Sequence, residues 1–84
     1  MNYWERVEET FEVMKVVIRE TKRPIPIKKV IEEMKKEGFT EEEILECISH
    51  KWDEGKVDLI MGDYKTGNYR IGKNLYHYVK VMEK

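Results

Sequence analysis

The sequence contains one cysteine, two prolines, no alanine and no glutamine. A single cysteine, Cys47, cannot form a disulfide within the chain, which is typical of proteins from a reducing compartment. No apolar run approaches the roughly 18 residues that a membrane span needs. The first residues, Met1–Arg6, are polar and mixed in charge, so we expect no secretory signal. These absences predict a cytoplasmic protein that does not contact a membrane.

The chain also lacks an excess of charge of either sign. Sixteen Lys and Arg stand against 17 Asp and Glu, a formal net charge of -1. Because a strongly basic balance is absent, any binding to nucleic acid would depend on a local basic patch. Charged residues still make up 39% of the chain, and most are Lys or Glu. This composition without glutamine is typical of heat-adapted proteins.

Residues that could support catalysis are few. His50 and His77 are the only histidines, and the sequence shows no Ser-His-Asp or paired-carboxylate arrangement. The glycines fall at predicted helix ends and turns rather than in a phosphate-binding loop. Cys47-x-x-His50 places two potential ligands one helical turn apart, whereas a structural zinc site needs about four. We expect no enzyme activity, small-molecule substrate, cofactor or metal, and we expect Cys47 at the edge of the core.

The 84 residues form one small domain, residues 1–84, in this interpretation. A first helix is predicted from about Tyr3 to Lys22, since apolar residues recur there at three- and four-residue steps. Its apolar stripe comprises Trp4, Val7, Phe11, Met14 and Ile18. Val13 and Val16 lie outside this stripe. Either they are buried within the domain, or they form a dimer interface together with Tyr76.

A second helix is predicted from Pro26 to about Glu37. The preceding residues 23–26 read as an extended linker, because proline disfavours helix in the residue before it, and Pro26 suits a first helical turn. The inward-facing residues of this helix are predicted to be Ile27, Val30, Ile31 and Met34.

The third helix has the strongest local signal. Thr40 is the expected N-cap, and Glu43 three residues later completes a capping box. Gly55 marks the end of the helix. Its inward-facing residues are predicted to be Ile44, Leu45, Ile48 and Trp52.

After the third helix the apolar period changes from helical to alternating. Val57, Leu59 and Met61 indicate a strand, and Tyr69 and Ile71 indicate the strand that returns from a turn-rich loop. Residues 74–82 admit two interpretations. A polar cap followed by apolar residues at helical steps favours a short helix, whereas the alternation of side chains permits a third strand. We favour the helix.

This order of elements resembles a winged helix-turn-helix domain. The resemblance rests on four segments, Ile27-x-x-Val30-Ile31, Gly38-Phe39-Thr40-x-x-Glu43-Ile44, Trp52-x-x-Gly55-x-Val57 and Asn68-Tyr69-Arg70-Ile71. In particular, the chain resembles the C-terminal winged-helix domain of archaeal replicative helicases and small archaeal transcription regulators. The resemblance implies an α+β fold with a three-helix core, a β-hairpin wing and a short C-terminal helix. It also implies DNA binding or protein–protein interaction, since winged helices serve both functions.

The third helix is predicted to present mostly carboxylates on its outward face. That face comprises Glu42, Glu43, Glu46, His50 and Asp53. Such a face would repel DNA phosphates in a major groove. It is either a solvated face that compensates the helix dipole or a docking surface for another protein.

The basic residues that could bind DNA lie mostly on the second helix and the wing. The candidate nucleic-acid contacts are Lys28, Lys29, Lys51, Tyr64, Lys65, Arg70 and Lys73. Contacts of this kind would hold double-stranded DNA by its phosphates without reading much sequence. We favour a DNA-binding protein, a small transcription regulator. The alternative is a protein-interaction module that uses the acidic third helix or the apolar face of the first helix, with a homodimer as one form.

Overall fold

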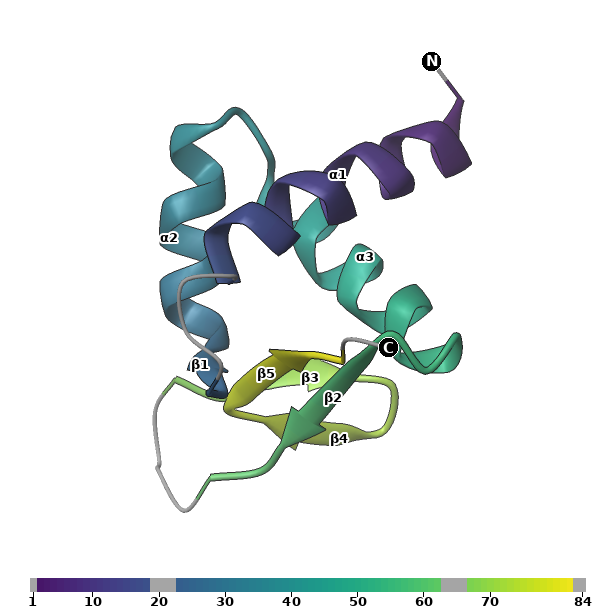
Figure 1. Cartoon of the computed structure of the whole chain (residues 1–84). Helices are drawn as coiled ribbons and strands as arrows, with labels where there is room; N and C mark the ends of the chain where they lie inside the picture. The colour runs from purple at the N-terminus through teal and green to yellow at the C-terminus, as the bar shows by residue number, and fades with distance from the viewer. Residues whose placement is uncertain (1, 19–22, 63–66, 83–84) are drawn as a thin grey trace.

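The computed structural model describes residues 2–18, 23–62 and 67–82, and shows three helices packed on small antiparallel sheets (Figure 1). In chain order the elements are α1 (Tyr3–Ile18), β1 (Ile25–Pro26), α2 (Ile27–Lys36), α3 (Glu41–Asp53), β2 (Val57–Ile60), β3 (Tyr69–Ile71), β4 (Asn74–Tyr76) and β5 (Tyr78–Val81). The fold is therefore α+β, as predicted, and it is compatible with a winged helix. No helix in the described part of the chain is long and apolar enough to cross a membrane.

The three-stranded sheet has the order β1-β5-β2, with both pairs antiparallel. Its central strand, β5, lies in the segment for which we favoured a helix, and that prediction is wrong. Val79 explains the difference, because it pairs with Ile25 on one side and Leu59 on the other and is fully buried. Burial between two partner strands outweighs a local helix signal, since tertiary context commonly overrides intrinsic propensity.

The predicted hairpin partner was also wrong. β2 pairs with β5 rather than with β3, and β3 instead forms a two-stranded hairpin with β4. The β3–β4 connection is the short turn Gly72-Lys73, where Gly72 takes a positive φ of 67°. A left-handed residue at this position suits glycine, so a tight local turn closes β3 on its nearest neighbour in sequence.

The linker before α2 is extended, as predicted, but it also forms a strand that sequence reasoning missed. Ile25-Pro26 lies at one edge of the sheet, paired with Val79 and Tyr78. An edge position accommodates Pro26, which has no N–H to donate.

The core forms where the helices meet the sheet. All four inward residues predicted for α2 are buried, as are Val7, Phe11, Met14 and Ile18 of α1. Trp4, predicted to face inward, is 59% exposed. The first turn of α1 projects beyond the other helices in Figure 1, and the Trp4 ring contacts Tyr3 and His50 rather than the core.

The buried face of α3 is rotated about the helix axis relative to the face that we predicted. It comprises Ile44, Cys47, Ile48 and Lys51. Leu45 is half-buried and Trp52 is 36% exposed, although both were predicted inward. Cys47 is fully buried rather than at the core edge, and burial raises the pKa of its thiol to about 12. The thiol is therefore protonated and unreactive at neutral pH.

The residues predicted for a dimer interface have three different environments. Val13 is half-buried against the core, whereas Val16 is 59% exposed. Tyr76 is only 6% exposed, and its ring packs edge-on against Trp52 with 5.3 Å between centroids. The Tyr76 side chain thus belongs to the core of the chain itself, and the prediction that it contributes to a dimer interface was wrong.

Candidate interaction surfaces

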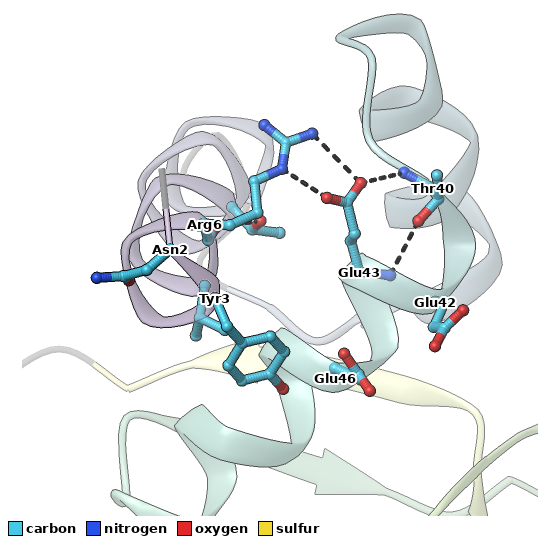
Figure 2. Close-up of a pocket in the computed structure, with 9 residues that line it drawn as sticks. Asn2, Tyr3, Arg6, Thr40, Glu42, Glu43 and Glu46 are labelled. Carbon is cyan, nitrogen blue, oxygen red and sulfur yellow. Dashed lines mark hydrogen bonds and ion pairs between the residues drawn. The ribbon is translucent and has the colours of Figure 1, made fainter.

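The start of α3 is fastened to α1 through Glu43. Its carboxylate accepts the backbone N–H of Thr40 at 2.9 Å, and the Thr40 hydroxyl accepts the N–H of Glu43 at 3.1 Å, which completes the predicted capping box. The same carboxylate accepts Arg6 Nε at 2.6 Å (Figure 2). The hydrogen bond from Arg6, followed by that from the Thr40 backbone, lowers the pKa of Glu43 to about 2. Glu43 therefore serves the helix junction rather than the free outward face that was predicted for it.

This arrangement predicts an acid-dependent loss of stability. A carboxyl whose pKa is lower in the folded state stabilises the fold above its ordinary value of 4.5, and the contribution is lost as pH falls toward 2. Glu43→Gln should lower the free energy of unfolding by about 1–2 kcal/mol at neutral pH. The difference from the parent protein should shrink toward zero near pH 2. Urea unfolding across this pH range measures the effect. Glu42→Gln is the matched control, and an equal loss in that variant would contradict the account.

Lys51 lies inside the domain and not on a DNA-facing surface. Its side chain is 0% exposed, and the ammonium pairs with Glu8 and, at 3.3 Å, with Glu54. Burial lowers the pKa of Lys51, but the hydrogen bonds to the two glutamates outweigh burial and leave that pKa raised. The ammonium is therefore charged and engaged within the chain, which corrects the prediction that Lys51 contacts nucleic acid.

The outward face of α3 is acidic, as predicted. Glu42, Glu46 and Asp53 are exposed. None of the three has an ion-pair partner among the described residues. His50 is half-buried rather than free, and its Nε2 lies 2.7 Å from the Tyr3 hydroxyl. Uncompensated carboxylates along this face oppose contact with a polyanion.

An aromatic cluster joins the first turn of α1 to α3. The ring centroids of Tyr3 and Trp4 lie 5.1 Å apart, and those of Trp4 and His50 lie 4.8 Å apart, with edge-on geometry. Sequence reasoning assigned Trp4 to the core because it continues the apolar stripe of α1. The sequence signal that could have placed Trp4 outside the core was its position in the first turn of α1, at the end of the apolar stripe.

Beside this cluster lies a pocket of about 240 Å³ between the starts of α1 and α3. Figure 2 shows Tyr3 from α1 close to Glu46, with Glu42 on the neighbouring turn of α3. The remaining lining residues are Asn2, Arg6, Val7, Thr10, Thr40 and Glu43. Arg6 is the cation of the pocket, and its guanidinium is already engaged by Glu43 and Glu9. The pocket consequently offers carboxylates and an aromatic ring to a ligand.

The start of α2 carries the exposed lysines Lys28 and Lys29. Lys29 has a long ion pair with Glu33 at 3.7 Å, and Lys28 has no ion-pair partner in the described ranges. The backbone N–H of Ile27 donates to His77 O, and the N–H of His77 donates to Ile60 O, both at 2.9 Å. The loop that follows Ile60 therefore leaves the sheet beside these lysines.

The far end of the same loop returns to this place. A Cβ added at Gly67 would lie 3.0 Å from the ring of His77, so Gly67 is close to the residue that bonds Ile27. The described ends of the segment between β2 and β3, residues 61–62 and 67–68, thus lie beside the start of α2. Two predicted contacts within the loop, Tyr64 and Lys65, lie outside the described residues.

Arg70 and Lys73 do not join this group. Both are exposed at the β3–β4 turn, where Arg70 donates to the Lys73 carbonyl. Figure 1 shows that turn at the opposite end of the sheet from the start of α2. Arg70 and Lys73 therefore lie apart from Lys28 and Lys29.

No group of three or more His, Cys, Asp or Glu in the described ranges could hold a metal ion. Comparison with family models, curated proteins and solved structures finds no match for the chain.

Proposed function

We propose that the chain is a winged-helix DNA-binding domain of the kind found in small transcription regulators. The order of elements supports this fold. A strand between the first two helices lies at one edge of the sheet, and residues 61–77 are inserted between the paired strands β2 and β5. In this proposal residues 61–77 form the wing, with the β3–β4 hairpin as its second half.

DNA is held mainly at the start of α2 and by the neighbouring segment between β2 and β3, rather than by α3 in a groove. The outward carboxylates of α3 would meet phosphate oxygens with the same charge, and the only lysine of that helix is buried. Phosphate contacts position a duplex without specifying its sequence. We therefore expect weak binding with little dependence on base sequence.

One observation carries this proposal. Lys28 is exposed in the first turn of α2, has no ion-pair partner among the described residues, and lies beside the described ends of the segment between β2 and β3. The N-terminal turn of a helix favours an anion through backbone N–H groups that lack a partner within the helix, although the N–H of Ile27 already donates to His77 O. A phosphate would meet charge, N–H donors and a loop at a single place.

The paired substitution Lys28→Gln/Lys29→Gln tests this site. We expect it to weaken duplex binding about 3- to 10-fold at roughly 50 mM salt, measured by fluorescence anisotropy. The slope of log affinity against log salt should fall in magnitude by about 0.9 for each phosphate contact removed.

The matched control is Lys35→Gln/Lys36→Gln, which removes the same charge from exposed lysines at the other end of α2. The control should retain the salt slope of the parent protein. Equal weakening by both double variants, or no binding by the parent protein at low salt, would refute the proposal.

A further inference from the structure

We propose that the chain has a second binding surface, which takes a lysine- or arginine-rich segment of another protein. The surface comprises Tyr3, Trp4, Glu42, Glu46 and His50, together with the pocket between α1 and α3, and we call it the aromatic–acidic surface. It lies at the end of the molecule opposite to the start of α2 (Figure 1). It is therefore independent of the proposed DNA site.

The rings of this surface are exposed yet held in place. Tyr3 is 46% and Trp4 59% exposed, and both rings contact His50 edge-on. The 2.7 Å hydrogen bond between the Tyr3 hydroxyl and His50 Nε2 ties the first turn of α1 to α3. A partner would consequently meet aromatic rings that need little further ordering, the property that makes such residues effective at interfaces.

The charge of the surface selects a cationic partner. Glu42 and Glu46 line the pocket and have no ion-pair partner among the described residues. At the edge of the pocket, burial and then the charge of Glu46 raise the pKa of Tyr3. Aromatic faces attract ammonium and guanidinium groups, and carboxylates form strong charge-assisted hydrogen bonds with them. A Lys or Arg side chain matches both features.

Competing occupants fit this surface less well. A nucleic acid would bring phosphates against unpaired carboxylates. An uncharged apolar segment could cover Trp4 but would leave the charges of Glu42 and Glu46 without a counter-ion as water is excluded. A second copy of the chain would have to present its own lysines here, and a change in oligomeric state would reveal that arrangement.

The test uses the full chain and a capped peptide of alternating lysine and glycine, titrated at about 50 mM salt. Glu42→Gln/Glu46→Gln should weaken binding of this peptide about tenfold or more. The matched control Glu32→Gln/Glu37→Gln removes the same charge from exposed positions on or beside α2. It should change the affinity less than about twofold.

Trp4→Ala should also weaken binding of the peptide several-fold. The thermal unfolding midpoint of this variant should stay near that of the parent protein, because the ring is mostly exposed. Equal weakening by the two glutamate variants would mean diffuse attraction to an acidic protein and would overturn the proposal. Absence of peptide binding would do the same. A concentration-dependent dimer that disappears in Glu42→Gln/Glu46→Gln would assign the surface to a second copy of the chain instead. The DNA-site variant Lys28→Gln/Lys29→Gln should leave the affinity for the peptide unchanged.

Discussion

Replacing Lys51 with alanine is expected to lower the free energy of unfolding by about 2–4 kcal/mol. The Lys51 side chain is completely buried in α3, and its ammonium lies 5.1 Å from the centre of the Phe11 ring. Alanine would remove both the aliphatic stem that fills this part of the core and the charge that Glu8 and Glu54 bind. Urea unfolding at neutral pH measures the loss.

The companion variant Lys51→Met separates volume from charge. Methionine is similar in length and fills the same space, and Glu8 and Glu54 are both exposed enough to be solvated when the ammonium is gone. We expect a cost below about 1.5 kcal/mol. DNA affinity should change less than about twofold, because the ammonium does not reach solvent. A large loss of DNA binding in a stable Lys51→Met protein would show that our assignment of this residue to the interior is wrong.

Replacing Met14 with alanine is expected to cost about 2–5 kcal/mol. Met14 is fully buried at the middle of the face of α1 that packs on the core. Small domains have total stabilities of about 5–15 kcal/mol, so this variant should be marginally folded at elevated temperature. The unfolding midpoint in urea and in a thermal scan measures the effect.

Val16 on the same helix is the matched control. Because it is 59% exposed, Val16→Ala should change stability by less than about 0.5 kcal/mol. A loss comparable to that of Met14→Ala, particularly one that depends on protein concentration, would show that Val16 is covered by a second copy. In that case the predicted role of Val16 in dimerisation would be supported.

Local sequence signals predicted α2 and the start of α3 well. The N-cap Thr40 and its capping-box partner Glu43 fixed the start of α3, and their hydrogen bonds are those expected. All four residues of the apolar stripe predicted for α2 are buried. These signals involve residues within one or two turns of each other, so a single sequence contains all the information they require.

The buried face of α3 shows where such signals were overridden. Ile44, Cys47, Ile48 and Lys51 follow the three- and four-residue steps of a buried stripe. The charge of Lys51 argued for an outward position, and the large ring of Trp52 argued for an inward one. The charge is accommodated by carboxylates from a distant segment of α1 and from the end of α3, and the first of these partners cannot be located from sequence spacing alone.

The sheet could not be predicted because its pairings join distant segments. β5 lies between β1, more than fifty residues earlier in the chain, and β2. Residues 74–82 admitted a helix pattern, which we favoured, and a strand pattern, and burial of Val79 between two strands decided for the strand. The long-range hydrogen bonds from Ile27 to His77 and from His77 to Ile60 place the end of β2 beside the start of α2. The acidic face of α3 followed from sequence, whereas this convergence required the fold.

We propose that DNA contacts the start of α2 and the segment between β2 and β3 while the acidic face of α3 remains free. The most direct test is an amide chemical-shift titration of the isotope-labelled chain with a short mixed-sequence duplex at low salt. We predict that the largest shifts occur at Ile27, Lys28 and Lys29 and at the loop ends Gly62 and Gly67, with α3 little changed. Largest shifts along Glu42, Glu46 and Asp53 instead would contradict the account.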